Sequence, residues 1–413
     1  MSLSLEHYGL SPVTGFLPSK PPLQRLPDAY FAPWENRLDG LHEALADHSI
    51  RKDIQKLPLL DTTRLQTTEE YQRAFLVLCF LSHAYVWGEE EAAKPCDQIL
   101  PAPLAVPLTK VSDHLGLHPV LCHASVALWN YRLIDEKGPL ELSNMEALAT
   151  FTGTPDESWF HIVTASIEIA GAPCLPAIVS ALDHVRNGHS AGLKASLETI
   201  ETALKEMNRQ LPRMFERLDP GVFYNSIRPY LSGWKSLEQG LIYEACDDRG
   251  HSFAGASAAQ SCLIAVLDVA LGVVHHETGQ QGPNRFMLTM RQHMPGSHRA
   301  FLEAVEAAAN VRPFILGLDD SGQELVRLYN ACVHQLKLFR DKHVQIVSLY
   351  VVNQARKQDR LGPQPKEAQQ VLGTAGASVM PFLKQARNET NETKVSLDEK
   401  KSRPSWLDWF LGR

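Results

Sequence analysis

Residues 325–353, with the sequence LVRLYNACVHQLKLFRDKHVQIVSLYVVN, predict one long helix with a single apolar stripe. The stripe recurs at steps of three and four residues and comprises Leu325, Tyr329, Cys332, Leu336, Phe339, His343, Ile346 and Tyr350. His343 therefore points toward the core. The helix alone leaves two interpretations open: a ligand for haem iron, or a core imidazole bonded to a backbone carbonyl. Arg340 lies one turn earlier on the same side, where a guanidinium could meet a haem propionate or a carboxylate.

Composition describes an ordinary globular protein. The 413 residues are 44% hydrophobic and 21% charged, which is typical of two to three domains of ~150 residues. Forty basic and 47 acidic side chains give a net charge of −7, so we expect no basic surface that would bind nucleic acid or a membrane. The N-terminal residues lack the pattern of a secretory signal, and we expect no membrane-spanning run. Seven scattered cysteines without a CxxC pair are typical of reduced thiols in the cytoplasm.

The order of apolar patterns predicts an all-α fold, because no segment alternates convincingly with a period of two. We expect a small helical N-terminal domain over residues 1–150 and a large helical domain over 151–383, which begins at the turn cluster TGTPDES (152–158). A charged, disordered tail would span 384–413. We expect a packed N-terminal arm over residues 1–40, a proline-rich loop, caps at Thr67 or Thr68 and at Ser297, and seven helical segments. The loop is placed at 94–107, and the helices at 34–53, 67–87, 119–135, 159–186 with a break near 173–176, 192–219, 263–275 and 298–309.

A few polar residues stand out from these patterns. Asp268 lies in the apolar run LIAVLDVALGVV, where a carboxylate needs a partner, and Arg340 is a candidate. FAGASAAQS, residues 253–261, lacks the spacing of a phosphate loop, so its small side chains better suit close approach of backbone to a flat ligand. Phe223 and Arg228 could face one pocket and bind an amino acid, although a surface arginine fits equally well. No acid–base motif appears, and His275, His276, His293 and His298 are interpreted as solvated or capping.

Four stretches in this order resemble indoleamine 2,3-dioxygenase: VFYNSIRPYLSGW (222–234), FAGASAAQS (253–261), MRQHMPGSHRAFLEAVE (290–306) and FRDKHVQIVSLYV (339–351). The resemblance implies an all-helical haem b enzyme that inserts both atoms of O₂ across the C2–C3 bond of the indole of L-tryptophan. Residues 151–383 would then be the haem-binding catalytic domain, and residues 1–150 would cover the distal side of its pocket. The product would be N-formylkynurenine, on the kynurenine route toward NAD. It further implies an electron donor that keeps the iron ferrous, no nucleic-acid or membrane partner, a monomer and a cytoplasmic location.

The resemblance also implies roles for individual residues. His343 would be the proximal ligand of the haem iron, with Arg340 and Asp268 forming a polar network beneath the haem and Ala256 and Ala258 running close to its distal face. Phe223 and Arg228 would stack on the indole and bind the substrate carboxylate. The remaining predicted substrate-binding positions are Phe160, His123, Thr164, Ser257 and Thr374. Thr374 belongs to GTAGAS (373–378), where the family closes the pocket, and the polar residues 355–370 would be a flexible lid connection.

Several positions depart from the family's pattern. His123 stands where the mammalian type-one enzyme has tyrosine, Thr164 where it has serine, and His161 where it has a second pocket aromatic; Ala256 and Ala259 replace glycines. These changes add bulk or polarity near the distal site and predict weaker tryptophan affinity than in efficient members, which a low-micromolar KM would contradict. The pattern is typical of a microbial, fungal member. Two alternatives remain: a low-activity haem-binding relative with a sensing or signalling role, and a helical scaffold without haem.

Overall fold

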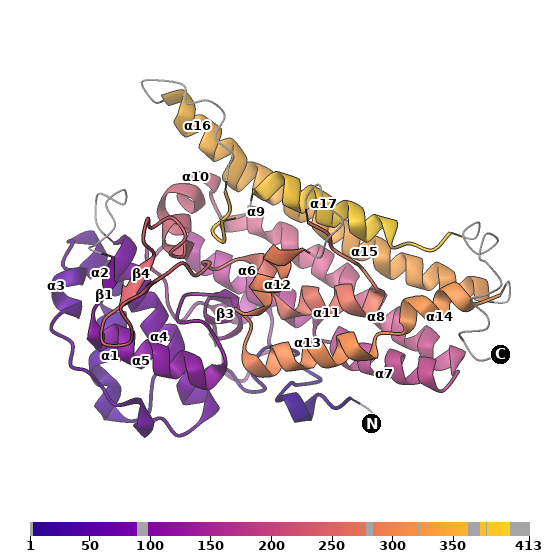
Figure 1. Cartoon of the computed structure of the whole chain (residues 1–413), viewed down its shortest axis with the longest axis horizontal. Coiled ribbons are helices and arrows are strands. Elements are labelled where there is room, and N and C mark those ends of the chain that lie inside the picture. Colours follow the sequence, from indigo (N-terminus) through magenta and orange to yellow (C-terminus); the bar gives the residue numbers. More distant parts are fainter. Residues whose placement is uncertain are drawn as a thin grey trace.

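Helices form nearly all of the regular structure in this computed structural model, which describes residues 3–88, 98–277, 284–319, 322–361, 372–376 and 378–396 (Figure 1). The predicted all-α fold is confirmed. The helices of the first 150 residues are α1 Ala32–Asp39, α2 Leu41–Ala46, α3 Ile50–Ile54, α4 Thr68–Trp87 and α5 Ala102–Leu115. They are followed by α6 Pro155–Gly171, α7 Cys174–Arg186, α8 Ser190–Gln210, α9 Met214–Arg217 and α10 Pro220–Val222. The last group is α11 Cys262–Leu271, α12 Arg285–Arg291, α13 Gly296–Ala308, α14 Val311–Gly317, α15 Gln323–Val347, α16 Asn353–Leu361 and α17 Val379–Glu392.

Five short strands accompany the helices in the described ranges. β1 Ile99–Leu100 pairs in parallel with β4 Leu241–Tyr243, which pairs antiparallel with β5 Gly250–His251. Ile99 lies opposite Ile242 in this sheet. β2 Arg132–Leu133 and β3 Met145–Glu146 form a separate antiparallel pair. Because β1 and β4 are far apart in sequence, the first sheet ties the N-terminal part to the rest of the chain.

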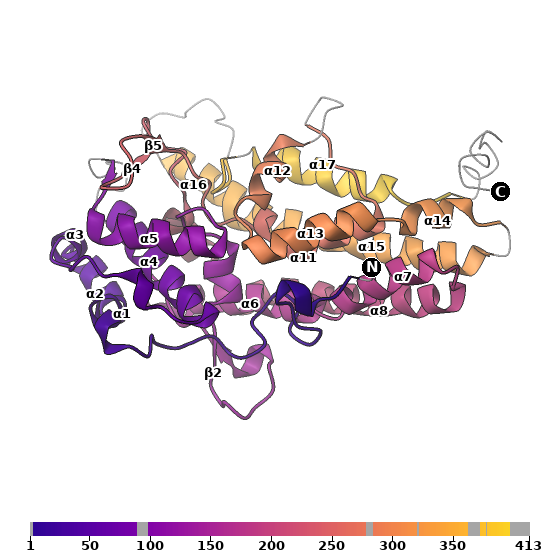
Figure 2. The same ribbon diagram turned by 60° about the horizontal axis from the view of Figure 1, so that its bottom comes forward.

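The N-terminal part is built around α4. The Thr67 side chain accepts a hydrogen bond from the Glu70 amide, which confirms the predicted cap of this helix. Every residue of α4 from Arg73 to Val86 is buried, so α5 and the short helices α1 to α3 can pack around it. The preceding arm lies along one face of the molecule (Figure 2), where Phe16 contacts Phe301 and His298 of α13. The predicted packed arm is therefore confirmed.

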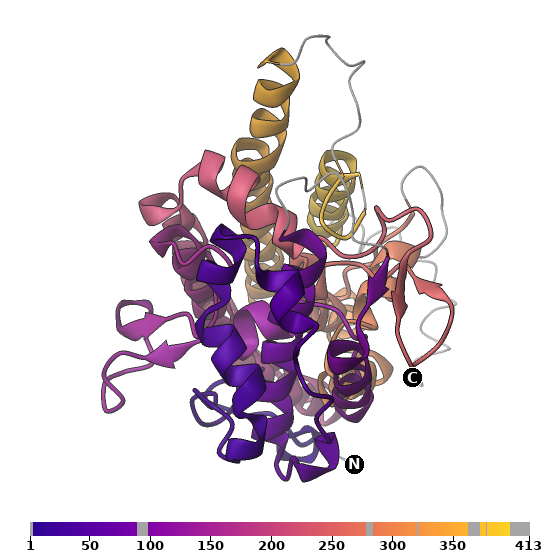
Figure 3. The ribbon, with the colours of Figure 1, turned by 90° about the vertical axis from the view of Figure 1, so that its left-hand side faces the viewer.

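The C-terminal part is a row of long helices. α8 packs between α7 and α15, and α17 packs along α15, as Figures 1 and 2 show. The predicted stripe of α15 is present, because Leu325, Tyr329, Cys332 and Leu336 are all buried. After Val347 the chain continues through the π-helical turn η11, Ser348–Val352, into α16, which protrudes from the body (Figure 3). α16 covers the start of the segment expected to be a flexible lid, so residues 355–361 are helical; residues 362–371 lie outside the described part of the chain.

Several boundaries predicted from the sequence are wrong. Residues 120–131 are buried, but the range 119–135 holds only the π-helical turn η4, Ala124–Leu128, and β2 instead of a continuous helix. α5 begins inside the predicted proline-rich loop, because prolines near its start are compatible with the first helical turn. α13 begins at Gly296, and no side chain, Ser297 included, caps it. α11 ends at Gly272, whose φ of +71° terminates the helix before His275.

The predicted disordered tail is also wrong over its first part, because α17 extends to Glu392. Ala386 and Thr390 are buried one turn apart on the face toward α15, and Val395 is buried beyond the helix end. The sequence did not predict this helix, because its buried residues are small and the residues around them are mostly charged or polar. Residues 397–413, including the apolar WLDWFLGR, lie outside the described range.

Most buried hydrophobic residues form one large cluster that includes both Leu10 and Val395, and Ala254, Met290 and Ala375 form a small second cluster. The boundary after residue 150 therefore stays a prediction. The stretch Pro155–Arg186 is long and apolar enough to cross a membrane, which was not expected from the sequence, but 67% of its most apolar window is buried within the fold. It is the core helix pair α6 and α7, and its apolar character is explained by packing.

Candidate functional site

A mostly apolar cavity of about 250 Å³ lies among α6, α15, α17 and the segments that precede α11. Two residue groups from distant parts of the sequence meet there: the α15 stripe and the small-residue stretch 253–261. The predicted site residues that line this cavity are His123, Phe160, Thr164, Phe223, Ala256, Ser257, Ala258, Arg340 and His343. The structure thus brings together most of the residues singled out from the sequence, and we call this space the central cavity.

His343 presents its imidazole to the central cavity from α15. Burial, and then the positive charge of Arg340, lower the pKa of His343 to about 4, so the ring is neutral at neutral pH. No hydrogen bond joins this ring to any other described residue, so the core-imidazole interpretation, which required a carbonyl partner, has no support in the described part of the chain. A neutral imidazole at the wall of an apolar cavity fits a haem ligand.

A buried polar network lies behind His343. Arg340 donates from Nη2 to Asp268 Oδ2 at 2.7 Å and from Nη1 to Thr390 Oγ1 at 2.9 Å. Asp268 therefore has the guanidinium partner expected for a carboxylate in an apolar helix. Burial alone would raise the pKa of Asp268, but Arg340 and His275 outweigh burial and lower it.

His275 and Glu389 extend this network, and neither was identified from the sequence. His275 Nε2 lies 3.1 Å from Asp268 Oδ2, and Nδ1 lies 2.6 Å from Glu389 Oε2. Burial favours the neutral form of Glu389, yet the hydrogen bonds from Gln385, His275 and the His276 amide lower its pKa. The interpretation of His275 as solvated is wrong, because its side chain is only 10% exposed. The sequence could not predict the contact between His275 and Glu389, because the helix that holds Glu389 was expected to be disordered.

Aromatic side chains form another part of the wall of the central cavity. Phe160 and Thr164 lie one turn apart on α6, and the Thr164 hydroxyl donates to the Phe160 carbonyl at 2.8 Å. The Phe160 ring centroid lies 5.2 Å from that of Phe223, which lies 5.9 Å from that of Tyr350. Such a cluster can hold a flat aromatic ligand by stacking or edge contacts.

Small residues form a third wall. Gly255 is needed for packing, because a Cβ there would lie 2.1 Å from the Leu231 carbonyl oxygen and 2.3 Å from the Gly233 nitrogen. The next residues, Ala256, Ser257, Ala258 and Ala259, all line the central cavity. The first half of the segment 253–261 serves packing, and its second half lines the central cavity. This placement fits the predicted close approach of the backbone to a flat ligand.

Arg228 and Thr374 lie beside the central cavity but do not line it. Arg228 donates from Nη2 to the Leu372 carbonyl at 2.6 Å, and its guanidinium lies over the Tyr224 ring. Burial lowers the pKa of Arg228. Thr374 donates to the Ala256 carbonyl at 2.6 Å and accepts a hydrogen bond from the Gly255 amide at its own carbonyl. Both residues connect the 372–376 segment to the cavity wall.

Glu168 is a cavity residue that the sequence interpretation missed. Its side chain is 3% exposed, and its Oε1 lies 2.8 Å from His123 Nε2. The Ser261 hydroxyl donates to the same oxygen at 2.6 Å. The signal was present, because Glu168 interrupts the apolar run ASIEIAGA as Asp268 interrupts its own helix.

Other histidines differ from their predicted settings. His293 and His298 are buried, not solvated, and burial lowers the pKa of each to about 3. His161 does not line the central cavity; it is fully buried beside Phe80, with Glu157 3.5 Å from its Nε2. The expected polarity of His161 at the distal site is therefore wrong, whereas His123, Thr164, Ala256 and Ala259 do line the cavity.

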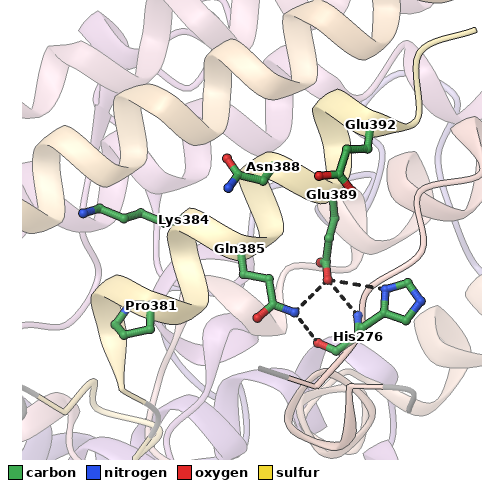
Figure 4. Close-up of a pocket in the computed structure, with 7 residues that line it drawn as sticks. All are labelled: His276, Pro381, Lys384, Gln385, Asn388, Glu389 and Glu392. Carbon is green, nitrogen blue, oxygen red and sulfur yellow. Dashed lines mark hydrogen bonds and ion pairs between the residues drawn. The ribbon is translucent and has the colours of Figure 1, made fainter. Parts of the chain in front are cut away.

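A second hollow lies on the outer face of α17 (Figure 4). Its polar atoms mostly bind one another: Glu389 accepts from the His276 amide and from Gln385, and Gln385 also donates to the His276 carbonyl. Among the described residues, no group of three or more His, Cys, Asp or Glu side chains could hold a metal ion. Two imidazoles line the central cavity, and that of His123 already meets Glu168, so His343 is the better candidate for binding a prosthetic group.

Comparison with known proteins agrees with this geometry. The family model of indoleamine 2,3-dioxygenase matches residues 4–393. An indoleamine 2,3-dioxygenase of Aspergillus candidus is 36% identical, with 94% of this chain and 97% of the relative covered. Human indoleamine 2,3-dioxygenase 2 is also 36% identical, over 95% of both chains. A 6-hydroxytryptophan 2,3-dioxygenase of Fusarium equiseti is 35% identical, over 94% of this chain and 98% of the relative.

Proposed function

The chain belongs to the indoleamine 2,3-dioxygenase family, and on that premise we propose that it cleaves the indole C2–C3 bond of L-tryptophan with O₂ to give N-formylkynurenine. Members of the family are haem-dependent dioxygenases that act on indoles. We further propose a cytoplasmic monomer that uses an electron donor to keep its iron ferrous and feeds the kynurenine route toward NAD.

The observation that carries this proposal is the His343 imidazole at an apolar cavity, where it forms no hydrogen bond with any residue in the described ranges. Haem, when bound, supplies the activation of O₂, so the protein needs an axial ligand, a dry pocket and a means of orienting the substrate. His343 would be the axial ligand, and Arg340 with Asp268 would fix the position of α15 beneath the haem. Ala256 and Ala258 would leave room for the flat macrocycle.

The substrate would occupy the distal part of the central cavity. Phe160 and Phe223 would pack against the indole, and His123, Thr164 and Ser257 would shape the pocket around it. Arg228 lies next to this wall, where its guanidinium could turn from the Leu372 carbonyl toward the substrate carboxylate. Thr374, tied to the Ala256 carbonyl, would close the pocket.

Absorption spectroscopy of the purified protein tests the proposal. We expect a Soret band that is lost or strongly shifted in His343→Ala, because the axial ligand is removed. His334→Ala is the matched control, since His334 lies on the same helix but is exposed. Absence of a Soret band in the wild type after haem reconstitution would overturn the proposal.

Arg228→Ala tests the substrate site in the same protein. Loss of a charge-assisted hydrogen bond should raise the KM for L-tryptophan by roughly 10- to 100-fold, corresponding to about 1.5–3 kcal/mol. Arg217→Ala serves as the control, because Arg217 stacks on Trp159 outside the central cavity. An unchanged KM would remove Arg228 from the site without affecting the haem assignment.

A tryptophan substituted on its six-membered ring is a second candidate substrate. The relative from Fusarium equiseti is named for 6-hydroxytryptophan, and the central cavity of this chain contains the buried carboxyl of Glu168. Turnover assays with L-tryptophan and its ring-hydroxylated derivatives, run in parallel, distinguish the two candidates.

A further inference from the structure

His275 is held between two carboxyl groups from different helices. Its Nε2 lies 3.1 Å from Asp268 Oδ2 on α11, and its Nδ1 lies 2.6 Å from Glu389 Oε2 on α17. An ionised carboxyl group only accepts hydrogen bonds, and a neutral imidazole has a single N–H group. Both contacts are therefore satisfied at once only when the three groups hold one additional proton, which the imidazole binds as the strongest base among them.

The charges around His275 also favour this proton. The charged groups that face the ring among the described residues are Asp268, Glu389 and Arg340, which donates to Asp268 Oδ2 at 2.7 Å. The exposed neighbour His276 lies 3.5 Å from Glu389 Oε1 through its Nδ1. Two carboxylates and one guanidinium leave one negative charge without a partner. Although burial disfavours a charged ring, the two carboxylates raise the pKa of His275.

This network extends from the central cavity to the outside of the protein. Arg340 lines the central cavity one turn before His343 on α15. At the other end, Glu389 lines the hollow on the outer face of α17, where its Oε1 accepts from the His276 amide at 2.9 Å (Figure 4). The side chains of Glu389 and His275 are each 10% exposed. A proton from solvent therefore reaches His275 through Glu389 without crossing the central cavity.

We propose that His275 binds a proton when the haem iron of this protein is reduced and releases it when the iron is oxidised. The electron comes from the donor that keeps the iron ferrous, and the proton comes from solvent. The inference rests on the proposed function, since it needs haem bound at His343. Reduction removes one positive charge at the central cavity, and the proton restores one in the network that Arg340 connects to it. Because His275 does not line the central cavity, it acts through Asp268 and Arg340.

Potentiometric titration of the haem-loaded wild-type protein is the first test, with the Soret band reporting the oxidation state. The midpoint potential should fall as pH rises through the pKa of His275, because the ferrous form binds the proton more tightly than the ferric form. Between pH 6 and 9 we expect the equilibrium constant for reduction to fall by at least about threefold in total. The largest possible slope is tenfold, or about 59 mV, per pH unit. A midpoint potential that is independent of pH would overturn the proposal.

His275→Gln is the second test. Glutamine keeps a hydrogen-bonding side chain but cannot bind a proton, so the midpoint potential of the variant should vary with pH by less than about half as much as that of the wild type. His334→Gln is the matched control, because His334 lies on α15 at an exposed position, and it should keep the wild-type dependence. An equal dependence in the wild type and in His275→Gln would assign the proton to another group and overturn the proposal.

Glu389→Gln is the third test, and it leaves the His275 ring in place. Removing one of the two carboxylates weakens proton binding at His275, so the pH range over which the potential falls should move down by about one unit. Glu392→Gln makes the same change at an exposed residue of the same hollow and should not move this range. An unmoved range in Glu389→Gln would contradict the proposal. The variant also keeps the proposal testable if His275→Gln does not fold.

These measurements separate the inference from the proposed function. Absence of a Soret band after haem reconstitution would contradict the dioxygenase itself. A protein that binds haem and cleaves tryptophan, but whose midpoint potential responds neither to pH nor to His275→Gln, would retain the proposed function and contradict only the role of His275.

Discussion

His275 connects two carboxylates that lie on different helices, and this placement sets its response to pH. Although burial lowers the pKa of the imidazole, Asp268 and Glu389 outweigh burial, so the pKa of His275 is raised above 6.5. A raised pKa in the folded state means that the folded chain binds the proton more tightly than the unfolded chain does. The resulting stabilisation is fully present below pH 6.5 and is lost as pH rises through the raised pKa.

Replacing His275 with Gln should therefore lower the free energy of unfolding most below pH 6.5, by roughly 1.5–3 kcal/mol, the size of a hydrogen bond to a charged group. The difference from wild type should shrink at higher pH. Urea unfolding at pH values from 5.5 to 9 measures it. His276→Gln is the control, because the neighbouring His276 side chain is 45% exposed. A difference independent of pH would contradict a charged His275.

Single residues were predictable where a polar side chain interrupts an apolar pattern. His343 and Asp268 were found on this ground, Arg340 was found as their neighbour and candidate partner, and Glu168 shows the same signal in α6. Pairings were harder, because the contact between His123 and Glu168 joins residues 45 positions apart. Only the packing of α6 against the turn that follows His123 creates it, and no local pattern records that packing.

At the scale of elements, three π-helical turns border the central cavity. His123 immediately precedes η4, Phe223 begins η7, Phe223–Ile227, and Tyr350 lies in η11. A π turn inserts extra width into a helix and redirects side chains, and such turns are frequent at functional sites. They explain why α15 was predicted well along its length, whereas 119–135 was not: a 3.6-residue pattern does not reveal where a helix widens or stops.

α17 contributes to the site through Thr390. The Thr390 hydroxyl accepts from Arg340 Nη1 and donates to the Ala386 carbonyl of its own helix. Thr390→Val, which keeps the shape, should leave a buried guanidinium nitrogen unpaired and cost about 1–3 kcal/mol of unfolding free energy. Chemical denaturation measures this cost.

Thr202→Val on α8 is the matched control for Thr390→Val, because its hydroxyl bonds only its own helix at an exposed position. Equal changes in unfolding free energy for the two variants would mean that the hydrogen bond between Arg340 and Thr390 does not stabilise the fold. This helix was missed because its sequence is mostly polar. Its polar contacts with α15, from Thr390 to Arg340 and from Arg387 to Asp341, join residues that are far apart in sequence.

At the scale of the whole molecule, buried neutral histidines join parts that are distant in sequence. The Leu121 amide donates to His83 Nε2 at 3.0 Å, and His83 Nδ1 lies 2.7 Å from the Tyr230 carbonyl oxygen. The His83 ring therefore links α4 to two segments that follow it in the sequence. Burial lowers its pKa to about 3. Burial likewise lowers the pKa of His293 and of His298 to about 3, so both rings are neutral at neutral pH.

These three histidines predict early loss of stability in acid. Each has a folded-state pKa near 3 against 6.5 in the unfolded chain, so below pH 6.5 the unfolded chain binds more protons and stability falls with pH. Each neutral ring contributes about 1.4 kcal/mol per pH unit, opposite in sign to the effect of His275. Unfolding free energies between pH 7 and 4.5 should show this slope.

His298→Gln should reduce the slope by the contribution of one histidine, whereas His42→Gln, at an exposed position, should leave it unchanged. An unaltered slope in His298→Gln would mean that His298 is protonated in the folded protein, and that the core around α13 admits a charge.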